Sequence, residues 1–304
     1  MQNEIKRSPL FYVGDKYKLI KEIRYYIPKE INRLIEPFVG GGSVFMNIEA
    51  KEYVLNDINP HIVEIHEMLT NYAHNSPKDF YDFAFQTIEF YSLSCSFKGD
   101  EVPQALKDKF PKTYIAHYNK EAYLKLRADY NTAPEKDPRL LYLLLIYGFN
   151  RMVRFNAKGD FNVPVGNVDF NTNTYQALEN YFNIIQRRNK IKWYKQDYKE
   201  FIQQISLHEG DFIYLDPPYL ITCSEYNKLW SIKEEINLYK LLDTLTESNV
   251  KWALSNVSHY KGEENTILTK WAQKYQSHSI KSNYISFRDN TIKKFNEVLV
   301  TNYL

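Results

Sequence analysis

The chain has 304 residues, 44% of them hydrophobic and 25% charged, which is enough to bury a full core in one large domain or two. The formal net charge of +2 gives no global sign of a polyanionic partner, although basic residues are grouped locally. The two cysteines lack metal-type spacing, so we expect neither a zinc site nor a disulfide scaffold. The N-terminus is polar and no apolar run approaches the roughly 18 residues of a membrane span. We therefore expect a soluble cytoplasmic protein without a membrane segment.

The first predicted unit is a strand, a glycine turn, a helix and a second strand. The strands are expected at Arg33 to Ile35 and at Tyr53 to Asp57, with the turn at Glu36 to Gly42 and the helix at Ser43 to Glu49. This order is typical of a βαβ unit.

From His61 to about Phe149 the apolar residues recur at helical spacing, and no convincing strand appears. Pro138 is expected to open a strongly apolar helix over residues 140–146. The segment from Arg154 to Pro164 has aromatic residues around a central Ala-Lys-Gly-Asp, which predicts a β-hairpin with Gly159 at positive φ. We therefore expect a helical insertion that ends in a hairpin.

The α/β alternation returns after Ile191. Strands are expected at residues 191–194, 212–215, 251–254 and 297–301, separated by helices near residues 198–207, 233–247 and 263–275. The predicted fold is therefore α/β, with a doubly wound, mostly parallel sheet covered by helices on both faces.

A glycine turn after the first strand lets a ligand approach the backbone, and an acid after the second strand can bind ribose hydroxyls. Gly40, Gly41, Gly42 and Asp57 occupy these places. The spacing differs from the G-x-G-x-x-G of dinucleotide folds, so the nucleoside half of S-adenosylmethionine is the better candidate, with a tight structural bend as the alternative.

The motif Asp216-Pro217-Pro218-Tyr219 follows the predicted strand Phe212 to Leu215. Consecutive prolines remove two backbone donors, which leaves carbonyls as free acceptors. An exocyclic amine can then donate one hydrogen to the Asp216 carboxylate and the other to a carbonyl, and this makes its nitrogen nucleophilic. Tyr219 offers a face on which a planar base can stack.

The chain resembles the Dam-like adenine-N6 DNA methyltransferases of the α arrangement, including those of T-even phages and of restriction-modification systems. The motifs that carry the resemblance lie in the same order through nearly the whole chain: P-L-x-Y-x-G-x-K from Pro9, E-P-F-V-G-G-G-S-V from Glu36, L-N-D from Leu55, R-x-N-x-K-G-x-F-N-V-P-x-G from Arg154, D-P-P-Y-L-I-T from Asp216 and L-S-N-V from Leu254. The resemblance implies a class I S-adenosylmethionine-dependent fold, with S-adenosylmethionine as cofactor, double-stranded DNA as substrate and no metal.

Cofactor-binding roles carry over by position. The resemblance implies that the cofactor is bound by Tyr12, Lys16, Phe38, Val39, Gly40, Gly41, Gly42, Ser43, Asp57, Asp197, Tyr198 and Tyr226. Asp57 is similar to the ribose-binding acid, and Asp197 to the acid that contacts the adenine amino group of the cofactor. Asp15 departs from a glycine common in the first motif of the family.

DNA-reading roles fall in the insertion and the hairpin. Arg154 matches an arginine that recognises a guanine of the target, which suits the bidentate fork of this side chain. The other implied DNA contacts are Phe149, Asn150, Met152, Asn156, Lys158 and Pro164. The expected division is a catalytic domain of residues 1–60 and 166–304, with a target-recognition domain of residues 61–165 that includes the hairpin at 154–164.

The expected activity is transfer of a methyl group to adenine N6 in double-stranded DNA, with the target base flipped out of the helix. The segment from Phe149 to Phe155 and the hairpin that follows it resemble the form found in GATC-methylating relatives, and this resemblance implies GATC as the target. Three alternatives stay open: an RNA adenine-N6 methyltransferase, a DNA cytosine-N4 methyltransferase, and a non-catalytic DNA-binding module on the same fold. We expect a monomer in a bacterial or phage-infected cell, and a restriction endonuclease partner is possible in principle.

Overall fold

The fold is described from a computed structural model, which covers residues 4–188, 190–222, 230–280 and 296–304. These residues form two compact units that interleave along the chain. One unit contains residues 1–15, 40–46 and 59–189, and the other contains residues 16–39, 47–58 and 190–304. We call them the helical unit and the sheet unit, and describe each by itself.

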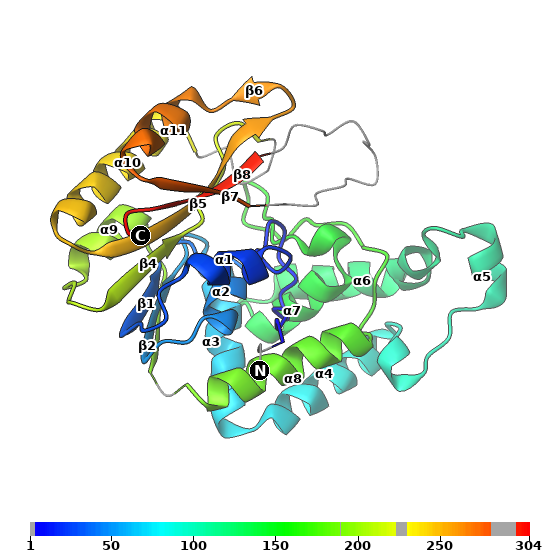
Figure 1. The fold of residues 1–304 in the computed structure, drawn as a ribbon. Helices are drawn as coiled ribbons and strands as arrows, with labels where there is room; N and C mark the ends of the chain where they lie inside the picture. The colour runs from blue at the N-terminus through cyan, green and yellow to red at the C-terminus, as the bar shows by residue number, and fades with distance from the viewer. Residues whose placement is uncertain (1–3, 189, 223–229, 281–295) are drawn as a thin grey trace. The chain divides into compact units, whose positions relative to one another are not determined.

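The sheet unit is built around one eight-stranded sheet in the described part of the chain (Figure 1). Its strands are β1 (Arg33–Glu36), β2 (Glu52–Asn56), β3 (Ile191–Tyr194), β4 (Asp211–Leu215), β5 (Lys251–Tyr260), β6 (Glu263–Glu264), β7 (Gln276–Ile280) and β8 (Asn296–Thr301). The strand order is β3-β2-β1-β4-β5-β8-β7, and β6 pairs with β5.

The sheet is parallel from β3 to β5 and antiparallel beyond it. Strands β1 and β2 pair parallel, as do β2 with β3, β1 with β4, and β4 with β5. Strand β8 runs antiparallel between β5 and β7. The carboxyl ends of β1, β2, β3, β4 and β5 therefore meet at one edge, where ligands bind in open α/β sheets. The predicted mostly parallel α/β fold is confirmed.

Helices flank this sheet. They are α1 (Ile20–Tyr26), α9 (Tyr198–Gln204), α10 (Ile232–Glu247), α11 (Thr266–Trp271) and the 3₁₀ turn η4 (Ala272–Lys274). The short helix α2 (Ser43–Asn47) connects β1 with β2. Core side chains of the sheet and these helices include Ile213, Leu238 and Trp252, all fully buried.

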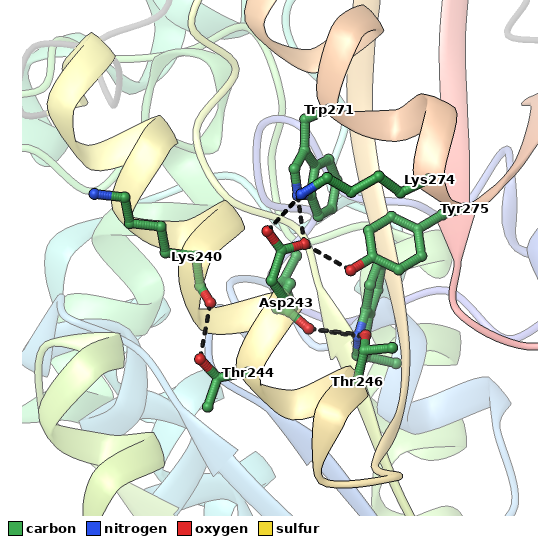
Figure 2. Close-up of polar contacts among 9 residues, drawn as sticks. Lys240, Asp243, Thr244, Thr246, Trp271, Lys274 and Tyr275 are labelled. Carbon is green, nitrogen blue, oxygen red and sulfur yellow. Dashed lines mark hydrogen bonds and ion pairs between the residues drawn. The ribbon is translucent and has the colours of Figure 1, made fainter.

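Asp243 on α10 connects this helix to the end of α11 and to η4 (Figure 2). Its carboxylate accepts hydrogen bonds from Trp271 Nε1 at 2.8 Å, Lys274 Nζ at 2.9 Å and the Tyr275 hydroxyl at 2.6 Å. Burial alone would raise the pKa of Asp243, but the bonds from Tyr275, Lys274 and Trp271 outweigh it and lower the pKa. These three hydrogen bonds hold the segment from Trp271 to Tyr275 against α10.

The helical unit contains the predicted insertion. Its elements are α3 (Pro60–Asn75), α4 (Pro77–Tyr91), η1 (Ser96–Lys98), α5 (Gln104–Lys109), α6 (Tyr114–Thr132), α7 (Pro138–Tyr147), η2 (Phe149–Arg151) and α8 (Thr172–Gln186). Three of these helices begin with proline behind a capping side chain, supplied by Asn59, Ser76 and Asp137. Residues 141–147 of α7 are all buried, as the apolar run predicts.

Three segments differ from the prediction. The helix expected over residues 263–275 starts later, because Lys261 and Gly262 have positive φ and turn the chain into a β5–β6 hairpin. Asn265 then caps α11 by accepting from Leu268 N. Strand β5 is longer than expected, and β7 was not predicted since its residues Gln276–Ile280 are mostly polar.

The compact units do not have the bounds of the predicted domains. Helix α8 belongs to the helical unit, as do residues 1–15 and the glycine turn from Gly40 to Gly42. The assignment of catalysis to residues 1–60 and 166–304, and of target recognition to residues 61–165, stays a prediction. No described helix is long and apolar enough to cross a membrane, and no metal-type cluster of three acids, cysteines or histidines occurs among the residues covered.

Candidate active site

The motif Asp216-Pro217-Pro218-Tyr219 lies directly after β4, whose five residues are all buried. Lys16, which precedes α1, places its ammonium 2.7 Å from Asp216 Oδ2. The Lys16 side chain is only 4% exposed and that of Asp216 is 20% exposed. A buried cation thus holds the carboxylate of the motif in one position. The contact between Lys16 and the cofactor stays a prediction. The structure shows a different contact, the ion pair of Lys16 with Asp216.

Tyr219 completes a cluster of four side chains. Its hydroxyl lies 2.8 Å from Asp216 Oδ1 and 2.9 Å from Oε1 of Glu297 on β8. The Lys16 ammonium lies 5.0 Å from the centre of the Tyr219 ring. Burial and the neighbouring carboxylates raise the pKa of Tyr219 well above its ordinary value, so the hydroxyl keeps its proton.

Glu297 is not among the residues predicted for the site. It lies about eighty positions beyond the motif, at the start of the apolar run Val298 to Val300, where a glutamate usually faces solvent. No local signal identifies it, because only the antiparallel pairing of β8 with β5 brings it to this place.

Three aromatic side chains gather near the ends of β1 and β3 in the sheet unit. Phe38 lies 5.2 Å from Tyr198 and 5.9 Å from Trp230 between ring centroids, and Tyr198 lies 5.9 Å from Trp230. Trp230 Nε1 donates to the buried Glu235 at 2.6 Å, which fixes its ring. These rings offer apolar faces of the kind that a purine requires.

The predicted acids Asp57 and Asp197 follow β2 and β3 in the same unit. Asp57 N donates to Tyr194 O at 3.4 Å, and Asp197 caps α9 by accepting from Lys199 N at 2.9 Å. Val39, also predicted, is buried, and its backbone N donates to Asn56 O at 2.8 Å. The structure therefore brings Phe38, Val39, Asp57, Asp197 and Tyr198 to the carboxyl ends of β1, β2 and β3.

Asn56 joins three of these strand ends and was missed as a positioning residue. Its fully buried amide donates to Pro37 O and to Gln196 O, both at 2.9 Å, and accepts from Gln196 N at 3.0 Å. The side chain thus locks the segment after β1 to the segment after β3.

We expect Asn56→Ala to lower the free energy of unfolding by about 1–3 kcal/mol, because buried backbone groups lose their partners. The affinity for the predicted cofactor, S-adenosylmethionine, should fall with it, since the loops that carry Phe38 and Asp197 are no longer joined. Chemical denaturation and calorimetric titration measure the two effects. Asn183→Ala, an exposed position on α8, is the matched control and should change neither.

The glycine turn in the helical unit is closely packed. A Cβ on Gly41 would lie 2.8 Å from Cβ of Tyr12, and one on Gly42 would lie 2.3 Å from the Phe45 ring. Gly42 also has a φ of +79°. Packing within the protein thus excludes larger residues at Gly41 and Gly42.

His66 supports this turn and was also missed. Its Nε2 lies 3.0 Å from Gly40 O, and its Nδ1 lies 3.0 Å from the Tyr181 hydroxyl. Burial lowers the pKa of His66 from 6.5 to about 4. A neutral imidazole that donates to Gly40 and accepts from Tyr181 fits both contacts. Ser43, predicted as a cofactor contact, is buried at the end of the turn.

The predicted hairpin forms in the helical unit, held by one antiparallel bridge between Phe155 and Phe161. Gly159 has a φ of +83°, as predicted. Asn156 accepts from Lys158 N at 2.9 Å and Asp160 N at 3.0 Å, so its side chain also shapes the turn. Lys158 is exposed.

Arg154 lies at the base of this hairpin. Its Nε donates to Asn162 Oδ1 at 2.8 Å and one terminal nitrogen donates to Asn162 O at 3.1 Å. These bonds orient the guanidinium and leave other N–H groups of the fork available. Helix α6 supports the hairpin, because Asn131 pairs with the backbone of Phe161 at 2.8 and 3.0 Å.

The remaining predicted DNA contacts lie before and after the hairpin. Phe149 is 49% exposed, so its ring is accessible to a partner. Asn150 has a φ of +51° in the turn η2, and Met152 follows it directly. Pro164 O accepts from Phe149 N at 2.8 Å, which joins the two segments. The predicted cofactor residue Tyr226 lies outside the described residues.

Curated proteins with similar sequences are methylases or methyltransferases by name. The modification methylase StsI of Streptococcus sanguinis is 32% identical over 311 residues, which cover 98% of this chain and 43% of the relative. The type II methyltransferase M.FokI of Planomicrobium okeanokoites is 32% identical over 310 residues, covering 99% and 43%. The DNA adenine methylase of Escherichia coli K12 is 26% identical over 304 residues, covering 96% and 94%.

The chain thus spans less than half the length of the first two relatives and nearly all of the third. A family model described as D12 class N6 adenine-specific DNA methyltransferase matches residues 12–285. This match includes the Asp216 motif, the glycine turn and the hairpin. The chain belongs to the family of D12 class N6 adenine-specific DNA methyltransferases.

Proposed function

We propose that this protein transfers a methyl group from S-adenosylmethionine to adenine N6 in double-stranded DNA. The observation that carries the proposal is the Asp216 carboxylate held by the buried Lys16 at the carboxyl end of β4. Family membership agrees with it. The full activity and the partners remain part of the proposal, since two of the relatives are more than twice as long as the matched region.

Asp216 is proposed to accept one hydrogen of the target amine, and the Pro217 carbonyl the other. Both bonds pull the N6 lone pair out of conjugation with the purine ring. S-adenosylmethionine, when bound, would supply the methyl group: the N–C bond would form as the C–S bond breaks, the bonding electrons would leave with sulfur, and the nitrogen would give up one proton to the Asp216 carboxylate or to water. Positioning accounts for most of the acceleration, because the methyl donor is already reactive.

The sheet-unit residues fit S-adenosylmethionine, whose chemistry is a methyl group on a cationic sulfur. Phe38, Tyr198 and Trp230 provide aromatic faces for its purine. Asp57 and Asp197 provide carboxylates for ribose hydroxyls and for an amino group. In the helical unit, Tyr12 and the turn Gly40 to Ser43 are proposed as the remaining contacts.

Incorporation of labelled methyl groups tests this function. The assay uses purified chain, labelled S-adenosylmethionine, and either double-stranded DNA or RNA, followed by identification of the methylated base. N6-methyladenine in DNA supports the proposal. Label in RNA would support the first alternative and N4-methylcytosine the second, and DNA binding without label would favour a non-catalytic module.

We propose GATC as the target, read in part by Arg154. Arg154→Ala should cost about 1–3 kcal/mol of discrimination at the guanine, because a bidentate contact to O6 and N7 is lost. Comparison of methylation rates on oligonucleotides with each base at that position measures the effect. Lys158→Ala is the matched variant, expected to weaken binding evenly across sequences and to reduce its salt dependence.

Sequencing of methylated genomic positions tests the target itself. Methylation confined to a different or longer site would overturn GATC and leave the adenine chemistry standing. The proposed working form is a monomer that acts on one strand at a time. We also propose that the protein is functionally paired with a restriction endonuclease. The names of StsI as a modification methylase and of M.FokI as a type II methyltransferase support that pairing.

A further inference from the structure

Glu297 is a buried carboxyl beside the catalytic motif. Its place on β8 lies in register with Val257 of β5 and Ile280 of β7. The side chain is 2% exposed, and its Oε1 lies 2.9 Å from the Tyr219 hydroxyl and 3.6 Å from the Lys16 ammonium. Its Oε2 is buried and has no hydrogen-bond partner in the described part of the protein.

The Tyr219 hydroxyl meets two carboxyl groups at hydrogen-bond distance, Asp216 at 2.8 Å and Glu297 at 2.9 Å. A hydroxyl has a single hydrogen and donates it to one acceptor. The second contact is therefore a hydrogen bond only if one of the two carboxyl groups carries a proton. Two ionised carboxylates at these distances would leave one repulsive contact between oxygen atoms.

The surroundings decide which carboxyl carries that proton. Asp216 has the Lys16 ammonium at 2.7 Å and is partly exposed, so its negative charge is compensated. Glu297 is more deeply buried, lies farther from the same ammonium and has one unpartnered oxygen. An uncompensated buried charge is far more costly than a buried neutral acid. Burial, with the charge of Asp216, raises the pKa of Glu297 although Lys16 opposes it.

We propose that Glu297 is a positioning residue for methyl transfer, a neutral acid that donates a hydrogen bond to Tyr219 and thereby directs the Tyr219 proton to Asp216. The inference rests on the proposed function. Among the described residues, the groups that face Glu297 are Lys16 before α1, Tyr214 on β4, and Asp216 and Tyr219 after β4. Within this set one cation is matched by one anion, and Asp216 keeps its charge and orientation for the target amine.

Two substitutions separate this role from that of a carboxylate. Glu297→Gln keeps a donor and an acceptor without charge, so kcat at neutral pH should stay close to that of the wild type. Glu297→Leu has no donor, and kcat should fall about tenfold, the equivalent of one lost hydrogen bond to a charged cluster. The Kd for S-adenosylmethionine should stay unchanged in both variants, since neither removes a predicted cofactor contact.

The pH profile gives a second readout. Ionisation of Glu297 as pH rises removes its donor, so wild-type kcat should decline on the alkaline side in a limb that Glu297→Gln lacks. Asp243→Asn is the matched control. Like Glu297, Asp243 is a carboxyl group beside a lysine and a tyrosine, but its partners Lys274, Tyr275 and Trp271 form a separate structural cluster (Figure 2). This substitution should lower stability and leave the shape of the pH profile unchanged.

Infrared difference spectra between wild type and Glu297→Gln need no catalysis, and they should contain the carbonyl stretch of a protonated carboxyl at neutral pH. The inference is overturned if that signal is absent, if Glu297→Gln loses as much kcat as Glu297→Leu, or if Glu297→Leu keeps wild-type kcat. The infrared test stands even if the leucine variant does not fold. Wild-type protein without adenine methylation would instead refute the proposed function.

Discussion

Asp216→Ala is expected to retain binding of S-adenosylmethionine and to lose methyl transfer, with kcat lower by at least about 10²–10³-fold. Losses of this size follow from removal of a preorganised polar group that acts on the reacting atoms. The variant loses the acceptor for the target amine and the partner of the buried Lys16. Rapid-quench measurement of labelled methyl transfer gives the rate, and calorimetric titration gives the Kd for the cofactor.

The fold should persist in this variant, because Lys16 still faces Glu297 at 3.6 Å and Tyr219 still has its contact with Glu297. Asp82→Ala is the matched control. Its carboxylate forms an exposed ion pair with Lys78 on α4, and such pairs contribute little to stability. Turnover in Asp216→Ala equal to that of the control would refute the role of the motif.

The catalytic motif could be predicted because its signals are local. A buried apolar strand, two prolines and a carboxylate adjacent in sequence determine where Asp216 emerges from the sheet. The turn at Gly40 to Gly42 and the hairpin around Gly159 follow from equally short patterns, since each requires a backbone conformation that glycine favours. For such segments a few adjacent residues are sufficient to predict the local backbone conformation.

The contacts that support the predicted site could not be predicted in this way, although Lys16 itself is among the predicted residues. Lys16 and Glu297 approach Asp216 from opposite ends of the chain, and only strand order and register bring them together. Asn56 precedes the predicted Asp57, yet its role depends on backbone groups of the segments after β1 and β3. Long-range pairing of polar groups has no periodicity, so a single sequence provides no signal for it.

His66 illustrates the same limit and leads to a second large effect. It is one polar residue on the buried face of α3, and the sequence gives no reason to prefer it over the other histidines of this helix. The structure places it, fully buried, between Gly40 O and the Tyr181 hydroxyl, each at 3.0 Å. A charged imidazole there would be desolvated and would lose Nδ1 as an acceptor for Tyr181.

We expect the protein to lose stability as pH falls from about 6.5 to about 4 because of this residue. The pKa of His66 is 6.5 as an ordinary value and about 4 in the folded state. The unfolded chain therefore binds a proton first, and the stability that the neutral form contributes is complete above pH 6.5. At roughly 1.4 kcal/mol per pKa unit, the loss attributable to His66 is about 3 kcal/mol.

Denaturant unfolding of wild type and His66→Gln over this pH range measures the effect as a difference between two curves, which removes the contribution of carboxylates common to both. The glutamine variant should show the weaker dependence on pH, since its amide can donate to Gly40 O and does not titrate. His74→Gln, exposed on the same helix, is the control and should follow the wild type. Parallel curves for wild type and His66→Gln would mean that His66 binds protons equally in the folded and unfolded states, and the proposed support of the glycine turn by a neutral imidazole would then be wrong.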